Sequence, residues 1–141
     1  MIKRKSTYII IALVLLLGWL WLKNINLRRE IDIKNEDLNQ VVTNNIKRFL
    51  SPNEEFSNKY SNIVSAREAY EICYEDEILH GDENKKYLKD LLYMIEDTMV
   101  NDINKFNEAF KDEEVQESMR KISENYDDMT SAVKVYKSLS K

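Results

Sequence analysis

The sequence predicts an all-α protein in which an N-terminal transmembrane helix is followed by an antiparallel four-helix up-down bundle of long helices. One observation is a run of 15 uncharged, almost wholly apolar residues, Tyr8 to Leu22. Another is that 141 residues include only two Gly and one Pro, too few turn formers for an all-β fold. A third is that apolar residues after Asn26 recur every three or four positions, the period of an amphipathic helix.

The uncharged run at residues 8–22 predicts a transmembrane anchor behind a short basic segment at 1–7. A helix of this length rises only about 22 Å, whereas the hydrocarbon core of a bilayer is about 30 Å thick. Lys5 and Lys23 can extend toward the headgroups, so the functional span covers about residues 6–25. Aromatic side chains near both ends of the run are typical of the two membrane interfaces.

A cleaved signal peptide is the alternative interpretation of a basic start followed by an apolar core. Cleavage requires small residues just after the core, and the sequence GWLWLKNINL stands there instead. We therefore expect the anchor to be retained, which makes the chain a single-pass protein of the cell membrane. Basic residues flank both ends of the anchor, so the side on which the remaining residues lie stays open.

Four helices are expected in the domain at residues 26–140, over about 26–50, 53–80, 83–110 and 114–139. The first continues the anchor without a break, because neither Gly nor Pro lies between Gly18 and Pro52. Short connections between the helices favour antiparallel neighbours, as in an up-down bundle.

The second helix has the sharpest start signal in the chain, the sequence Ser51-Pro52-Asn53-Glu54. Its spacing predicts Ser51 as the N-cap, Pro52 at the first helical position and Glu54 as the residue that completes a capping box. The helix is expected to end at His80-Gly81, because Gly readily adopts the left-handed C-cap conformation.

The third helix is expected to begin with Asp82 as its N-cap. The apolar spacing breaks between Phe110 and Val115, which places a turn near 111–114; a bend at 100–104, where helix propensity is low, is the alternative. In the fourth helix apolar side chains alternate steps of four and three, so this helix is expected to run unbroken to residue 139. Its seam consists of Val115, Met119, Ile122, Tyr126, Met129, Val133 and Tyr136.

The net charge of -4 is unevenly distributed along the chain. Residues 1–5 carry three basic groups, residues 23–50 carry six basic and four acidic groups, and residues 51–141 carry 12 basic and 21 acidic groups. Basic groups beside an anchor favour anionic lipid headgroups. The acidic body argues against a nucleic-acid partner, because binding nucleic acid requires a cationic surface.

The sequence predicts no catalytic residue, no cofactor and no metal site. It contains no Gly-rich phosphate loop, and its single histidine, His80, is the only base available for Ser-His or Cys-His pairs. Glu77 and His80 form one E-x-x-H pattern, but the second copy that a dimetal bundle needs is missing. His80 instead precedes Gly81, where a histidine interacts with the last carbonyls of a helix. Cys73 is expected to be a half-buried core thiol. Tyrosines on or beside the apolar seams are expected to pack in the core; these are Tyr60, Tyr70, Tyr126 and Tyr136.

Four stretches of the chain carry a family resemblance. They are Asp37-Leu38 with Val41, Val42, Ile46, Lys47 and Phe49; Ser65-Ala66-Arg67; Glu96 with Phe106; and Ile122, Met129, Val133 and Tyr136. In this order they are similar to the segments D-L-I-P-N-L-V-x-x-V-K-x-Y, E-A-R, E-x-Y-P…N-F and I…Y-N-x-x-V-x-x-Y of the LemA family of bacterial membrane proteins. The chain lacks the family's I-P-N after Leu38 and its Y-P after Glu96, it has Met129-Thr130 where the family has Y-N, and it is shorter than usual. The resemblance implies one membrane span, a four-helix domain of very long helices and no established enzymatic activity.

Together these features favour a LemA-like, membrane-anchored helical-bundle protein without enzymatic activity, acting as a protein-interaction or scaffolding module at the bacterial cell membrane. We expect the N-terminal helix to bind the bilayer and the helical domain to bind another protein or a second copy of itself. No nucleic acid and no small-molecule substrate is expected as a partner. A subunit of an envelope, secretion or division complex is the first alternative. A metal-binding bundle that uses Glu77, His80 and Cys73 is the second.

Overall fold

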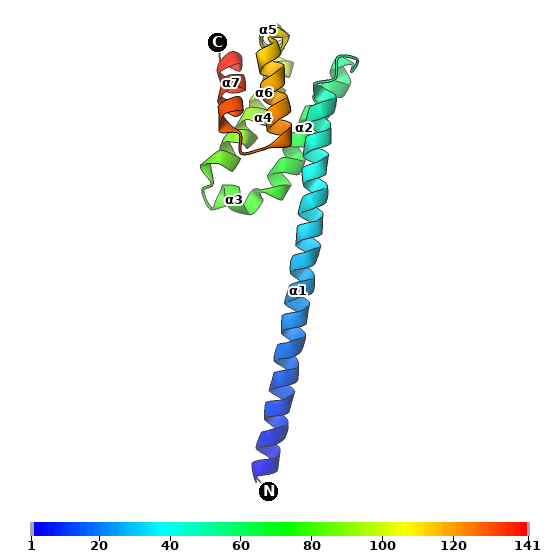
Figure 1. Cartoon of the computed structure of the whole chain (residues 1–141), viewed down its shortest axis with the longest axis vertical. Coiled ribbons are helices and arrows are strands. Elements are labelled where there is room, and N and C mark those ends of the chain that lie inside the picture. The colour runs from blue at the N-terminus through cyan, green and yellow to red at the C-terminus, as the bar shows by residue number, and fades with distance from the viewer. Residues whose placement is uncertain (1, 141) are drawn as a thin grey trace. The chain divides into compact units, whose positions relative to one another are not determined.

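The computed structural model describes the backbone of residues 2–140, and the side chains of that range except those of 2–7, 9 and 11. Within it the chain forms seven helices and no strand, which confirms the all-α prediction (Figure 1). The helices are α1 (Ile2–Phe49), α2 (Phe56–Cys73), α3 (Glu75–Leu79), α4 (Glu83–Asn101), α5 (Ile103–Lys111), α6 (Glu113–Glu124) and α7 (Met129–Leu139). The predicted count of four bundle helices is wrong, because each of the last three is broken into two. The chain divides within α1 into two compact units, Met1–Glu36 and Asp37–Lys141.

Helix α1 is continuous from Ile2 to Phe49, as the absence of Gly and Pro after Gly18 predicted. Among the described residues, however, no helix combines the length and the apolarity that crossing a membrane requires. The structure therefore does not support the predicted span at 8–22. That run is helical, but it rises only about 22 Å against a hydrocarbon core of about 30 Å. The predicted basic segment at 1–7 lies outside the residues whose side chains are described.

A loop at residues 50–55 follows α1, and the capping box predicted there is wrong. Helix α2 begins only at Phe56, with no side-chain hydrogen bond at its N-cap. The Ser51 carbonyl instead accepts a hydrogen bond from the Glu54 N–H at 3.4 Å, so this sequence forms a turn. Pro52 suits the turn as well as a helix start, because its fixed φ matches the second position of common turns.

The predicted second and third helices are each broken at one residue whose backbone leaves the helical range. Tyr74, with φ -117° and ψ 21°, separates α2 from the short helix α3. Asp102, with φ -147° and ψ 70°, separates α4 from α5, and its carboxylate accepts a hydrogen bond from the Lys105 N–H at 3.0 Å. The alternative bend at 100–104 is therefore confirmed.

Local cap signals elsewhere in the sequence are confirmed. Gly81 has a φ of 89°, a left-handed conformation that its lack of a Cβ allows. Asp82 accepts hydrogen bonds from two backbone N–H groups in the first turn of α4, at 3.0 and 3.1 Å. Asp112 caps α6 by accepting one hydrogen bond, from the Glu114 N–H at 2.8 Å, at the turn predicted near 111–114. These boundaries depend on short-range chemistry alone.

The chain turns between α6 and α7, where the apolar spacing predicted one unbroken helix. That prediction is wrong because residues 125–128 (Asn-Tyr-Asp-Asp) bond to backbone groups outside a helix. Asn125 accepts a hydrogen bond from the Asp127 N–H at 3.1 Å, and Asp128 accepts one from the Ser131 N–H at 3.1 Å, which caps α7. The three-four spacing continues through the turn because Tyr126 packs against the core.

From Asp37 onward, the chain folds back and forth around one apolar core: it turns back after α1, after α3, after α5 and after α6 (Figure 1). The largest fully buried side chains are Val42, Ile46, Phe49, Ile63, Tyr70, Leu88, Leu91, Leu92, Ile95, Met119, Ile122 and Leu139. Full burial of such a side chain contributes about 1.5–3 kcal/mol. This core fixes the ends of the helices whose side chains form the surface features described next.

Candidate functional site

A groove lies where the end of α1 meets α2, α5 and α6. Its volume is about 510 Å³. Pockets of roughly 300–1,000 Å³ bind small ligands and anchoring side chains of proteins. Three phenyl rings and three basic side chains define its character; these are Phe49, Phe106, Phe110, Lys59, Lys111 and Arg120. We refer to it as the phenylalanine groove.

The rings of the phenylalanine groove are held by two helix ends. Phe49 is the last residue of α1, and Phe106 and Phe110 lie one turn apart on the same face of α5. The Phe49 ring centroid is 5.1 Å from that of Phe110 and 6.0 Å from that of Phe106, distances typical of tilted and edge-on aromatic pairs. Gln116 on α6 donates a hydrogen bond from Nε2 to the Phe110 carbonyl at 2.7 Å. This bond ties α6 to the last turn of α5.

The basic side chains of the phenylalanine groove come from three different helices. Arg120 on α6 pairs with Glu117, one turn earlier. Lys59 on α2 and Lys111 at the end of α5 have no carboxylate within 4.0 Å among the described residues. Because residues 51–141 carry a large excess of acidic groups, a site lined by three cations and no carboxylate stands out from its surroundings.

The phenylalanine groove has the character of a binding site. Its apolar floor and basic side chains match a group that is apolar and negatively charged. No carboxylate, thiol or imidazole lines it, so it contains neither a nucleophile activated by a base nor an acid–base pair. The sequence predicted Phe106 and Phe110 as apolar helix positions, but not the groove. The one local signal was Lys111 directly after this pair of rings.

A second feature is a cluster of three tyrosines beside α1. The ring centroid of Tyr70 is 4.7 Å from that of Tyr74 and 5.7 Å from that of Tyr126. Tyr126 donates its hydroxyl to the Asn39 carbonyl at 2.8 Å and lies 2.6 Å from the Thr43 hydroxyl. Tyr74 donates to Asn39 Oδ1 at 3.0 Å. These bonds join α1 to α2 and to the turn before α7.

The Tyr70 hydroxyl is the only buried side-chain polar atom among the described residues that has no hydrogen-bond partner. Burial raises the pKa of Tyr70, and burial is also the largest cause of the raised pKa of the other two clustered tyrosines. The three tyrosines pack in or against the apolar core, as predicted for Tyr70 and Tyr126. Tyr60 is half-buried against the core as predicted, whereas Tyr136 is exposed and packs beside Tyr87 at 5.6 Å, so its predicted core position is wrong.

The residues of the metal-binding alternative are not brought together. The thiol of Cys73 is buried, and burial raises its pKa. Glu77 is exposed. His80 is exposed at the end of α3, with Nδ1 2.7 Å from the Asp76 carbonyl oxygen, as expected of a C-terminal histidine. Among the described residues, no group of three or more His, Cys, Asp or Glu side chains is placed to hold a metal ion.

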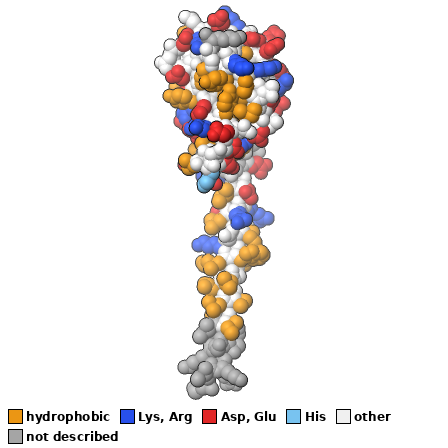
Figure 2. All heavy atoms as spheres, turned by 90° about the vertical axis from the view of Figure 1, so that its left-hand side faces the viewer, with side chains coloured by type: hydrophobic (Ala, Val, Ile, Leu, Met, Phe, Trp, Pro, Cys, Tyr) orange, Lys and Arg blue, Asp and Glu red, His pale blue; other side chains and the backbone are white. Residues whose placement is uncertain are grey.

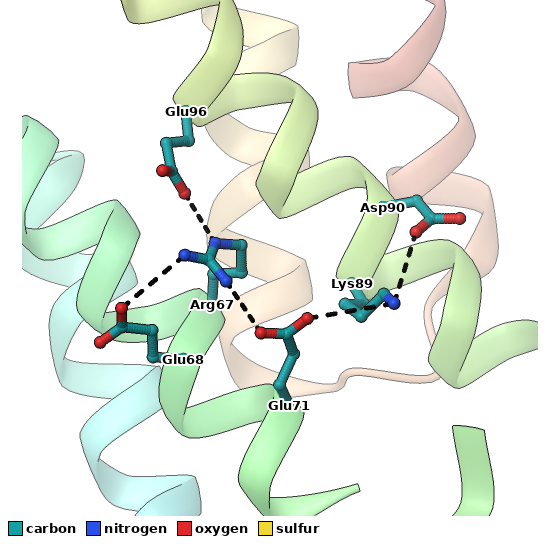
Figure 3. A network of polar contacts seen from close by, with 6 residues as sticks. All are labelled: Arg67, Glu68, Glu71, Lys89, Asp90 and Glu96. Atoms are coloured by element: carbon teal, nitrogen blue, oxygen red, sulfur yellow. Dashed lines mark hydrogen bonds and ion pairs between the residues drawn. The ribbon is translucent and has the colours of Figure 1, made fainter. Parts of the chain in front are cut away.

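A polar network joins α2 to α4 (Figure 3). Arg67 on α2 donates from Nε to Glu96 Oε2 at 2.6 Å, across to α4, and from Nη1 to Glu71 Oε2 at 2.8 Å. Glu71 continues the network to Lys89 at 3.9 Å. The Arg67 and Glu96 side chains are only 17% and 16% exposed, so this is a half-buried, charge-assisted contact. The Arg67–Glu96 contact holds the two helices together, and Glu71 and Lys89 of the same network border a hollow of about 310 Å³.

The unit up to Glu36 presents apolar side chains to its surroundings. Every residue from Ala12 to Leu22 is exposed, including Trp19 and Trp21. Figure 2 shows hydrophobic side chains of α1 above the grey residues, followed by basic groups. Lys23 lies 5.3 Å from the centroid of the Trp19 ring. Apolar surface of this extent is rare on soluble monomers and marks a surface that something else covers.

No protein-family model, no curated protein and no solved structure matches this chain.

Proposed function

We propose that this chain is a LemA-like, membrane-tethered helical module without enzymatic activity, which binds another protein at the bacterial cell membrane. The observation that supports it most is the continuity of α1. One helix carries the exposed apolar run at 12–22 and then supplies Val42, Ile46 and Phe49 to the core of the second unit. A membrane tether requires a helix with one apolar end, which enters the bilayer, and another end that packs into the core of the folded domain.

The exposed apolar side chains of this run lie on all faces of the helix. Consecutive residues of an α-helix are turned by about 100°, so the five consecutive apolar residues at 13–17 cover every face. A helix that is apolar on all faces is typical of a lipid environment, whereas a single partner helix covers one stripe. Trp19, Trp21 and Lys23 can lie at the interface and compensate for the short run, at a modest cost per ångström of mismatch.

The contact of Arg67 with Glu96 also supports the proposal. Both positions belong to the stretches that resemble the LemA family, and they lie 2.6 Å apart on neighbouring helices. These two positions are 29 residues apart in the sequence, yet their side chains form one hydrogen-bonded ion pair. This contact links the resemblance to the packing of α2 on α4.

The phenylalanine groove is the proposed place of binding. Its partner is a protein segment that presents an aromatic or aliphatic side chain next to a carboxylate, because the groove has an apolar floor beside Lys59 and Lys111. The acidic surface elsewhere repels such a segment and so directs it to the groove. A tether raises the effective concentration of the module at the membrane, so modest contacts suffice.

Vesicle flotation of the full chain tests the tether. The chain is expected to float with vesicles of phosphatidylcholine and phosphatidylglycerol, and Leu16→Arg is expected to weaken this binding roughly a hundredfold. Ile33→Arg is the matched control, because Ile33 lies on the same helix and is as exposed as Leu16 but is outside the apolar run. A parent chain that stays at the bottom of the gradient, or a Leu16→Arg variant that floats like the parent, would overturn the tether.

A further inference from the structure

Helix α1 carries a heptad pattern within its apolar run and beyond it. Seven positions alternate steps of three and four, and they are Ile10, Leu13, Leu17, Leu20, Asn24, Leu27 and Ile31. In coiled-coil notation the a positions are Ile10, Leu17, Asn24 and Ile31, and the d positions are Leu13, Leu20 and Leu27. We refer to these seven residues as the α1 seam. Three heptads of this kind are the usual minimum for a coiled coil.

All seven residues of the α1 seam are exposed. Leu27 and Ile31 lie past Lys23 and still keep about half of their side-chain surface exposed, at 49% and 56%. Leu17, Leu20 and Asn24 also border a hollow of about 460 Å³ on the surface of α1. Such a hollow between seam residues is where a side chain from a facing helix packs in a coiled coil.

Asn24 favours a second copy of the same helix, in parallel orientation, as the partner of the α1 seam. At an a position its amide is buried by the facing helix, and a buried amide without a hydrogen-bond partner costs about 1–3 kcal/mol. In a parallel pair of identical helices in register, a positions face each other, so Asn24 meets its own copy and the two amides bond. In an antiparallel pair, a faces d, and Asn24 would meet a leucine of the seam instead of a second asparagine.

We infer that the α1 seam is a self-association surface, on which a second copy of this chain packs as a parallel, in-register coiled coil with Asn24 paired to Asn24. The parallel orientation rests on the proposed function, because tethered chains enter a membrane the same way round. The seam ends at Lys34, the next d position, and Leu38, the next a position, packs against the core of the chain's own second unit. Lys23 and Arg28 flank the seam at g and e positions, where anionic headgroups offset their mutual repulsion.

Cysteine cross-linking of the full chain in vesicles tests the inference. In a Cys73→Ser background, Asn24→Cys is compared with Asn26→Cys, which replaces another exposed asparagine two positions on and about 200° around the helix. Asn24→Cys is expected to form the disulfide dimer roughly tenfold faster, because the seam raises the local thiol concentration. Equal rates at the two positions would overturn the inference.

Two further variants test the direction of pairing. Leu17→Cys and Ile31→Cys are each expected to cross-link to themselves and not to each other, as parallel register requires. Mixed cross-links between them would contradict parallel pairing. The two hypotheses can be tested separately. If the chain floats but cross-links equally at positions 24 and 26, the self-association seam is rejected and the membrane tether is supported. If the chain does not float, the membrane tether is rejected. Cross-linking rates of Asn24→Cys and Asn26→Cys in solution still test the seam.

Discussion

The hydroxyl groups of Thr43 and Tyr126 lie 2.6 Å apart, and this contact joins the last turns of α1 to the connection between α6 and α7. Thr43 also donates to the Ser123 carbonyl at 3.1 Å, and Tyr126 donates to the Asn39 carbonyl at 2.8 Å. The end of α1 is thus hydrogen-bonded to residues 80 to 87 positions away in the sequence.

Tyr126→Phe is expected to lower the free energy of unfolding by about 1–3 kcal/mol, because it leaves the Asn39 carbonyl and the Thr43 hydroxyl without this partner. Urea unfolding of the full chain in detergent, followed by circular dichroism, measures the change. Tyr93→Phe is the control, since Tyr93 is exposed and should change little. A loss no larger than that of the control would show that the tyrosine bonds do not stabilise the fold.

Tyr70→Phe is expected to have the opposite outcome. Its hydroxyl is fully buried without a hydrogen-bond partner, so removing it abolishes a desolvation cost and leaves the ring contacts in place. The variant should be as stable as the parent or more stable, by up to about 1 kcal/mol, in the same unfolding measurement. A marked loss of stability would mean that this hydroxyl has a partner in solution.

Stability is expected to fall in alkali. Burial raises the pKa of Tyr70, Tyr74 and Tyr126 in the folded chain above the usual phenol value of about 10. The folded state therefore keeps protons that the unfolded state has already released, so the stability present below pH 10 is lost as the pH rises above it. Unfolding midpoints between pH 8 and 11 measure this loss. Tyr70→Phe should reduce the slope above pH 10.

Arg67→Met is expected to destabilise the bundle by about 1–3 kcal/mol, because it leaves the half-buried Glu96 carboxylate without its charged donor. Arg67→Met with Glu96→Gln should recover part of the loss, since the second change removes the unpaired charge. Thermal unfolding of the two single variants and the double variant gives the coupling energy. Arg120→Met, at an exposed pair, should cost no more than about 1 kcal/mol. A coupling energy of zero would show that the Arg67–Glu96 contact in Figure 3 does not contribute to stability.

The phenylalanine groove is expected to bind anilinonaphthalene sulfonate, a probe that combines aromatic rings with a negative charge. Lys59→Glu and Lys111→Glu should each weaken binding roughly threefold to tenfold, because reversal replaces an attraction with a repulsion. Fluorescence titration in detergent-solubilised chain measures the affinity. Lys86→Glu, on the exposed face of α4, is the matched charge control. Equal effects of all three reversals would mean that the probe responds only to net charge.

The sequence predicted the helix boundaries at Gly81, at Asp82 and near 111–114, which depend on neighbouring residues, and it missed the break at Tyr74. The φ of Gly81 and the caps at Asp82 and Asp112 follow from contacts within one turn of the chain. The break at Tyr74 has no comparable local signal. In the structure the Tyr74 hydroxyl bonds to Asn39, 35 residues away, which is information that a local pattern does not contain.

The regular spacing from Val115 to Tyr136 was misleading for a different reason. Apolar side chains at steps of three and four show which residues face a core, and they do so equally well for one helix and for two helices joined by a tight turn. The deciding residues were Asn125 and Asp128, whose side chains favour turns over helix interiors. The phenylalanine groove was beyond prediction, because its residues come from four helices whose packing no single segment determines.

Tryptophan fluorescence gives the most direct test of the membrane tether. Trp19 and Trp21 are the only two tryptophans, and both lie at the end of the exposed apolar run, so the emission reports on this segment alone. Addition of vesicles to the full chain is expected to shift the emission to the blue. Lipids brominated high on the acyl chain should quench it more strongly than lipids brominated at the chain end. An emission that keeps its position and its accessibility to iodide when vesicles are added would contradict the tether.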